Sequence, residues 1–94
     1  MSTLAAIKIV IHGHVQGVFF RAFVLEKAAK LGLTGYVCNL ASGQDIEILA
    51  EGEKEKLQKL IELLKIGPPL SRVDGIKTTW SKYNAKFAQF AIRY

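Results

Sequence analysis

The segment GHVQGVFFR, residues 13–21, combines residue types that suit the binding of an anion. Gly13 and Gly17 allow backbone conformations in which successive N–H groups point into one concavity, and the start of a helix leaves further N–H groups unpaired. Arg21 adds a planar set of donors that matches the oxygens of a phosphate. A cation is unfavourable at a helix start unless an anion offsets it. The segment therefore indicates either an anion site or an ordinary strand-to-helix turn with a solvated arginine.

The apolar pattern places this segment between a strand and a helix. Short Ile- and Val-rich or alternating runs predict strands, and apolar residues at helical spacing predict helices. The predicted strands are residues 4–12, 33–40, 46–52, 72–80 and 87–94, and the predicted helices are residues 19–31 and 53–65. This order predicts a ferredoxin-like α/β plait of the α+β class: a βαββαβ unit plus a C-terminal strand, with two helices on one face of a mainly antiparallel sheet. The alternating charges of the second helix predict a solvated face.

The predicted topology brings Arg21 close to Asn39. The first strand, the first helix and the second strand form one crossover unit, which makes the two strands parallel. Their C-terminal ends then lie on the same edge of the sheet. The first strand delivers the loop from Gly13 to Val18 to that edge, and the second strand delivers Cys38 and Asn39.

Length and composition indicate a single domain over residues 1–94, with an ordinary folded composition. The net charge of +5 and the pI near 9.5 favour anionic partners, and phosphorylated metabolites, nucleic acids and anionic membranes all fit such a surface. The lone Cys38 forms no internal disulfide, and no apolar run approaches the roughly 20 residues that span a bilayer. We expect a cytoplasmic monomer without a membrane partner.

Two segments resemble the acylphosphatase family. GHVQGVFFR meets every fixed position of its signature: Gly, any residue, Val, Gln, Gly, Val, any residue, Phe or Met, Arg. GYVCNLASG, residues 35–43, is similar to a second family segment, with Cys38 at a position that is usually basic. The following QDIE holds one residue more than the usual spacing. AEG, GPP followed by SRV, and the closing FAIRY extend the resemblance over essentially the whole chain.

The resemblance implies an enzyme that hydrolyses acyl phosphates, the mixed anhydrides of a carboxylic acid and phosphate, without a metal or other cofactor. It implies that Arg21 binds the phosphate of this small-molecule substrate and that Asn39 positions the attacking water. The implied phosphate cradle is the backbone of Gly13, His14, Val15, Gln16, Gly17 and Val18. Gln16 either orients this loop or contacts the substrate.

Other candidate residues favour structural roles. His12 and His14 flank Gly13, but two histidines without Cys, Asp or Glu at ligand spacing are a weak metal signal, so we expect no metal site. Cys38 lies beside Asn39, yet no His–Asp pair that would activate it as a nucleophile is readable around it. We therefore interpret Cys38 as a structural thiol.

Two alternative functions follow from the same fold. A non-catalytic module that binds phosphate or carbamoyl phosphate would use the same loop, as acylphosphatase-like domains of hydrogenase-maturation carbamoyltransferases do. An RNA-binding domain is suggested by GVFFRAFV, but in RNA-binding domains such an aromatic run lies on the third strand, whereas here it opens the first helix. The exposed face of the third strand offers Glu47 and Glu51 instead of stacking rings, so we expect no nucleic-acid partner.

Overall fold

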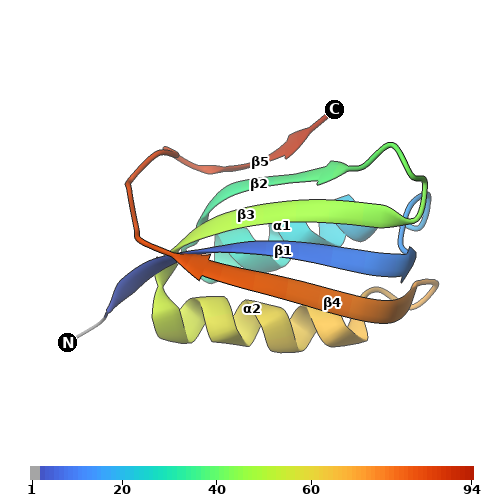
Figure 1. Cartoon of the computed structure of the whole chain (residues 1–94), viewed down its shortest axis with the longest axis horizontal. Helices are drawn as coiled ribbons and strands as arrows, with labels where there is room; N and C mark the ends of the chain where they lie inside the picture. The colour runs from blue at the N-terminus through green and yellow to red at the C-terminus, as the bar shows by residue number, and fades with distance from the viewer. Residues whose placement is uncertain (1–2) are drawn as a thin grey trace.

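Five strands and two helices follow one another in the predicted order over residues 3–94, the part of the chain that this computed structural model describes (Figure 1). The elements are β1 (Leu4–His14), α1 (Phe20–Lys30), β2 (Thr34–Asn39), β3 (Asp45–Glu53), α2 (Lys54–Ile66), β4 (Arg72–Ser81) and β5 (Phe90–Arg93). Most boundaries lie within one or two residues of the sequence prediction. The exception is β5, which begins three residues later than predicted.

The strands form one sheet in the order β4-β1-β3-β2-β5. β3 is antiparallel to both β1 and β2, so β1 and β2 run parallel to each other with β3 between them. β4 is antiparallel to β1, and β5 is parallel to β2. Both helices lie on one face of the sheet, α1 against β2 and β5 and α2 against β3 and β1 (Figure 1). The predicted ferredoxin-like plait is confirmed.

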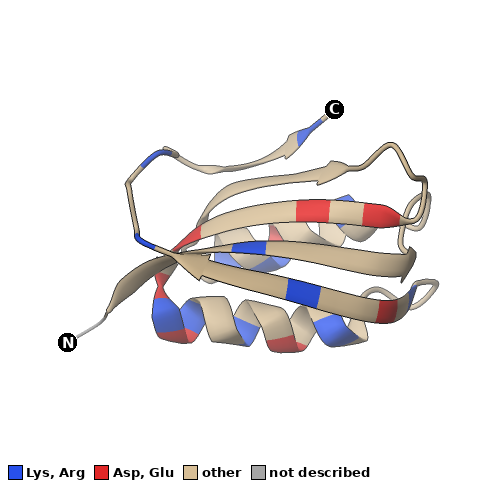
Figure 2. Ribbon diagram, viewed as in Figure 1, with Lys and Arg blue, Asp and Glu red and all other residues tan. Residues whose placement is uncertain are grey.

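The core lies between the sheet and the two helices. Alternate residues of β1 and β3 face the helices because successive side chains of a strand point to opposite faces. The fully buried residues of β1, β3, α1 and α2 include Ile7, Ile9, Ile11, Ile46, Ile48, Val24, Ala28, Leu57, Leu60 and Leu64. The charged side chains of α2 are exposed, and Figure 2 shows them spread in both signs along the helix, as the pattern predicted.

The first strand is longer than predicted, and this changes the role of Gly13. β1 continues through Gly13 and His14, which pair with Val73 and Arg72 of β4 after a register shift at His12. Gly13 has a φ of 145°, and a Cβ at this position would collide with the backbone carbonyl of Arg72. Gly13 therefore permits a β-bulge and a close approach of two strands. The predicted loop over residues 13–18 was wrong at its start.

Glu51 is buried, which corrects the prediction of an exposed carboxylate on β3. Its side chain lies on the face of the sheet away from the helices, as the alternation predicts, but it is only 2% exposed. The segment between β4 and β5 lies against it: the backbone N–H groups of Asn84 and Lys86 donate to its two carboxylate oxygens at 2.8 and 3.0 Å. The predicted strands, residues 72–80 and 87–94, left Asn84 and Lys86 in an unassigned connection, so the sequence prediction missed these contacts.

Neither helix of the described residues combines the length and the apolar character that crossing a membrane requires.

Candidate active site

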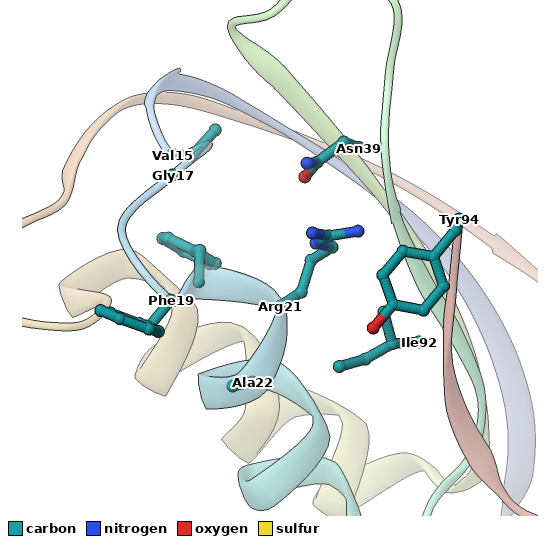
Figure 3. Close-up of a pocket in the computed structure, with 9 residues that line it drawn as sticks. Val15, Gly17, Phe19, Arg21, Ala22, Asn39, Ile92 and Tyr94 are labelled. Atoms are coloured by element: carbon teal, nitrogen blue, oxygen red, sulfur yellow. The ribbon is translucent and has the colours of Figure 1, made fainter.

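A cavity of about 310 Å³ opens at the edge of the sheet where β1 and β2 end (Figure 3). It is lined by Val15, Gly17, Phe19, Phe20, Arg21, Ala22, Asn39, Ile92 and Tyr94. These residues come from four parts of the chain: the loop after β1, the first turn of α1, the end of β2, and β5 with the residue that follows it. The parallel arrangement of β1 and β2 brings Arg21 and Asn39 to one cavity, as the topology predicted.

The loop between β1 and α1 is anchored by its valines and leaves its backbone donors available. Val15 and Val18 are buried in the core, and Gly17 adopts a left-handed conformation with a φ of 73°. No acceptor among residues 3–94 is bonded to the backbone N–H groups of residues 15–19. A row of unpaired N–H groups beside a helix start is the usual setting for binding an oxyanion.

Gln16 holds this loop against the β2–β3 hairpin. Its Nε2 donates to the backbone carbonyl oxygens of Leu40 and Asp45, both at 2.9 Å. The side chain is therefore engaged with the hairpin, and it does not line the cavity. Of the two roles that the sequence left open for Gln16, orienting the loop is the one this geometry supports.

The hairpin after Asn39 is closed by its own hydrogen bonds and accommodates the additional residue near Gln44. The Leu40 N–H donates to the Asp45 carbonyl at 2.9 Å, and the Ser42 hydroxyl donates to Asp45 Oδ2 at 2.6 Å. His12 Nδ1 lies 2.8 Å from Asp45 Oδ1. The hydrogen bonds from Ser42 and His12 lower the pKa of Asp45, so its carboxylate stays ionised and keeps the turn closed.

Arg21 projects from the first turn of α1 into the cavity. Its guanidinium carbon lies 4.9 Å from the centre of the Tyr94 ring, within the range of a cation–π contact. The first turn of α1 contains no acidic residue, and no side chain caps the helix start. Among the described residues no Asp or Glu side chain lines the cavity either, so no acidic side chain offsets the positive charge of Arg21 there.

Asn39 contributes a buried acceptor to the same cavity. It is the last residue of β2, and strand alternation places it on the helix side with Val37, opposite to Cys38. Figure 3 shows its amide pointing toward the Arg21 guanidinium. Asn39 Oδ1 is buried and has no hydrogen-bond partner among the described residues. Because buried polar atoms are nearly always paired, this oxygen marks a position for a ligand or a water.

Half of the predicted site residues line the cavity. The structure brings together Val15, Gly17, Arg21 and Asn39, whereas Gly13, His14, Gln16 and Val18 do not line it. The Gly13 N–H donates to the Gln44 carbonyl at 2.9 Å, so this donor is already used. His14 is exposed and lines a separate cavity together with His12 and Arg72.

The sequence prediction missed the apolar part of the lining, namely Phe19, Ala22, Ile92 and Tyr94. Helical spacing offers a signal for the first pair, because Phe19 and Ala22 are three residues apart and so share one side of the helix start. Strand alternation offers a signal for Ile92 and Tyr94, two residues apart at the end of β5. Alternation alone does not place these two residues at the cavity. That step also needs the parallel pairing of β5 with β2, which the sequence pattern did not predict.

Cys38, His12 and His14 do not line the cavity. Burial and the nearby Glu47 carboxylate raise the pKa of the Cys38 thiol, and its Sγ lies 4.0 Å from Glu47 Oε2. A raised pKa keeps the thiol protonated, which agrees with a structural role. Among residues 3–94, no group of three His, Cys, Asp or Glu side chains lies close enough together to hold a metal ion.

The family model described as Acylphosphatase matches residues 7–92 of this chain. The chain belongs to the acylphosphatase family. An acylphosphatase from Dehalococcoides mccartyi is 44% identical over 88 residues, which are 94% of this chain and 97% of that protein. The crystal structure of acylphosphatase from Bacillus subtilis superimposes with a TM-score of 0.91 at 41% identity and covers 98% of this chain and 100% of that one.

A larger protein also matches, over a small part of its length. Full-length HypF, in a phosphate- and nucleotide-bound form, is 35% identical with a TM-score of 0.89, and the match covers all of this chain but 12% of HypF. The relatives named as acylphosphatases match along nearly their whole length. The alternative of a non-catalytic binding module is therefore not favoured.

Proposed function

We propose that this acylphosphatase-family chain hydrolyses acyl phosphates to a carboxylate and inorganic phosphate, with Arg21 binding the phosphoryl group and Asn39 orienting the attacking water. The observation that carries the proposal is the buried, unpartnered Asn39 Oδ1 facing the same cavity as the Arg21 guanidinium. The guanidinium suits a phosphate and the amide oxygen suits a water, and both groups line the same cavity. Family membership supports the reaction class.

The leaving group explains why so few catalytic groups suffice. Breaking the phosphorus–oxygen bond of an acyl phosphate releases a carboxylate, whose conjugate acid has a pKa of about 4. Such a group leaves as an anion at neutral pH and needs no proton from the enzyme. We therefore infer a reaction that uses no general acid and needs no metal or cofactor.

Arg21 and the loop after β1 supply the charge stabilisation. Phosphoryl transfer depends mainly on positioning and on stabilising the charge of the phosphoryl oxygens. The guanidinium donates two parallel hydrogen bonds to such oxygens, and the unpaired N–H groups around Val15 and Gly17 add further donors. The start of α1 contributes its partial positive charge. A bound phosphate in turn relieves the unfavourable position of Arg21.

Asn39 orients the water and does not act as a base, because an amide takes up no proton near neutral pH. Its Oδ1 accepts a hydrogen bond from the water and directs a water lone pair toward phosphorus. As the new oxygen–phosphorus bond forms, the bond to the acyl oxygen breaks and the carboxylate leaves. The water proton passes to a phosphoryl oxygen of the substrate.

We further propose that residues 1–94 act as a single domain and as a monomer in the cytoplasm, without a nucleic-acid or membrane partner. Arg21, Asn39 and the loop all come from one chain, so the cavity needs no second subunit. The only cysteine, Cys38, is free, which suits a reducing compartment.

Benzoyl phosphate hydrolysis, followed as loss of the acyl-phosphate absorbance with and without a chelator, tests this function. We expect Arg21→Gln to abolish turnover and to weaken competitive inhibition by inorganic phosphate. We expect Asn39→Ala to lower kcat by about a hundredfold, as the loss of one positioned polar group does, and to leave phosphate inhibition unchanged.

Asn84→Ala is the matched control, because Asn84 is exposed and uses its backbone N–H, not its amide, to bind Glu51. It should keep wild-type turnover. Near-normal kcat in Asn39→Ala would contradict the water-positioning role, and loss of activity with chelator would contradict the metal-free reaction. Folded protein without any turnover would overturn the enzyme proposal itself.

A further inference from the structure

We propose that His12 and Asp45 are positioning residues for the reaction: the ion pair between them holds the β2–β3 hairpin, and with it Asn39, in place beside the loop between β1 and α1. This inference rests on the proposed function, because the two residues act through Asn39 and touch neither the substrate nor the water. Neither residue lines the cavity. Loss of the pair should therefore lower kcat and leave the binding of inorganic phosphate unchanged.

The start of β3 lies between the two strand ends that build the cavity. β3 is paired with β1 on one side and with β2 on the other, and Asp45 is its first residue. His12 stands opposite Asp45 on β1. Asn39, the last residue of β2, stands opposite Ile46, the next residue of β3. The position of Asp45 therefore affects the spacing between the loop that follows β1 and the amide of Asn39.

Asp45 receives hydrogen bonds from three parts of the chain. Its carbonyl oxygen accepts from the Leu40 N–H and from Gln16 Nε2, both at 2.9 Å. Its carboxylate accepts from the Ser42 hydroxyl at 2.6 Å and lies 2.8 Å from His12 Nδ1. Because an ionised carboxylate only accepts hydrogen bonds, His12 Nδ1 carries the proton of this bond. Asp45 thus joins β1, the loop and the hairpin turn at one residue.

The turn before Asp45 depends on such bonds for its position. Residues 41–44 are all exposed, so burial in the core does not hold them. The Ser42 bond stays within the turn, whereas the His12 bond ties the Asp45 side chain to another strand. A hydrogen bond to an ionised group is about twice as strong as one between neutral groups. Without this bond the end of the hairpin opens more often, as weakly packed segments do.

A displacement of the hairpin reaches the reaction through Asn39. Its buried Oδ1 has to hold the attacking water in line with phosphorus, and a misplacement of about 1 Å can cost a hundredfold in rate. The phosphate-binding groups have other supports, since Val15 and Val18 anchor the loop in the core. A looser hairpin therefore slows the attack of water more than it weakens the binding of phosphate.

Benzoyl phosphate kinetics in His12→Ala and Asp45→Ala test the pair, with competitive inhibition by inorganic phosphate measured in each variant. We expect kcat to fall about threefold in His12→Ala, the size expected for one lost ion pair at a partly exposed position. We expect a fall of about tenfold in Asp45→Ala, because this change also removes the acceptor of Ser42. The inhibition constant of phosphate should stay at the wild-type value in both variants.

The double variant tests whether the two residues act through one bond. His12→Ala combined with Asp45→Ala should be no slower than Asp45→Ala alone, because the first change removes nothing that the second has left. His12→Asn is the conservative variant: its amide nitrogen, like Nδ1, is bonded to Cγ and donates a hydrogen bond. It should recover most of the kcat that His12→Ala loses.

Lys8→Ala is the matched control. Lys8 pairs with Glu47 at 3.3 Å in another ion pair between β1 and β3, farther along both strands from the cavity. This variant should keep the wild-type kcat. An equal loss in Lys8→Ala and His12→Ala would assign the effect to the pairing of the two strands and would overturn the inference.

Three further outcomes would decide against the pair. They are a wild-type kcat in His12→Ala, which should fold because His12 is exposed, a double variant whose loss is the product of the two single losses, and a phosphate inhibition that weakens in parallel with kcat. A wild type that does not hydrolyse benzoyl phosphate would instead overturn the proposed function itself.

Discussion

The two helices pack on the same face of one sheet, yet they begin in opposite ways. α2 starts from an extended residue, Glu53 (φ −64°, ψ 131°), its first N–H donates to the Thr3 carbonyl at 2.8 Å, and Glu55 lies in its first turn. α1 starts from Phe19 in a left-handed conformation, and its first turn carries Arg21 and no acidic residue. An acidic residue at a helix start is favourable and a basic one is unfavourable.

This difference separates a helix start that stabilises the fold from one that suits the phosphate binding proposed above. The start of α2 is complemented by groups of the protein itself. The start of α1 instead combines unpaired backbone donors, a cation and backbone strain around one cavity. All three are unfavourable in the free protein, and the phosphate of the proposed substrate would offset the first two. Features that cost stability thus identify the candidate site.

After the complete loss expected for Arg21→Gln, the next largest effect is expected when the cation of α1 is kept but its shape is changed. Arg21→Lys retains the charge and loses the two parallel donors, so we expect kcat/KM for benzoyl phosphate to fall about a thousandfold. Arg72→Lys is the matched control, because Arg72 is exposed, pairs with Asp74 and does not line the cavity. Wild-type activity in Arg21→Lys would mean that a point charge suffices there.

An acidic residue in the first turn of α1, as in α2, should lower the activity and raise the stability of the fold. Ala22 is exposed in the first turn of α1 and lines the cavity, so Ala22→Glu places a carboxylate beside Arg21. We expect kcat/KM to fall more than about tenfold, because the carboxylate competes with the phosphate for the guanidinium. We expect the free energy of unfolding, measured in urea, to rise by about 0.5 kcal/mol.

Ala22→Gln controls for side-chain size in this experiment. It should change activity far less than Ala22→Glu, because it adds no charge. Equal losses in the two variants would assign the effect to steric blocking of the cavity.

Relieving the strain before α1 should stabilise the fold. Asparagine tolerates the left-handed region better than phenylalanine, so Phe19→Asn should raise the free energy of unfolding by about 1 kcal/mol. Urea denaturation checks this. Phe19→Ala removes the ring but lacks the polar side chain that lets asparagine tolerate the left-handed region, so it should gain less. A destabilised Phe19→Asn would show that the exposed ring contributes more to the fold than its backbone costs.

The smallest effect is expected at the start of α2. Glu55→Ala removes the favourable first-turn charge and should lower the free energy of unfolding by about 0.5 kcal/mol at low ionic strength, and by less in salt. Activity should stay at the wild-type level, because Glu55 does not line the cavity. A change in kcat would contradict this expectation, because it would show that the start of α2 influences the cavity at the start of α1.

Local patterns were sufficient to predict that Arg21 and Asn39 lie at one edge of the sheet. The GHVQGVFFR segment pointed to Arg21, and the crossover rule placed Arg21 and Asn39 at the same edge of the sheet, where both line the cavity. These predictions succeeded because a strand-helix-strand unit fixes the direction of both strands from nearby sequence.

The remaining features depend on pairings between distant segments. Gly13 is required by the close approach of the Arg72 carbonyl on β4, and Glu51 is buried by residues that follow β4. Ile92 and Tyr94 reach the cavity because β5 pairs in parallel with β2. Pairing between strands that are far apart in the sequence depends on the packing of the whole chain. Alternation alone could therefore assign a residue to a face of the sheet but could not predict which strand lies beside it.

The hydrogen bonds of Gln16 also have a consequence for motion within the site. One side chain joins the phosphate loop to two carbonyl groups of the hairpin that follows Asn39. These two hydrogen bonds tie the loop to the hairpin, so a displacement of the hairpin pulls on the loop. In the proposed reaction, this link fixes the separation between a water on Asn39 and a phosphorus atom in the loop, although an exposed turn lies between Leu40 and Asp45.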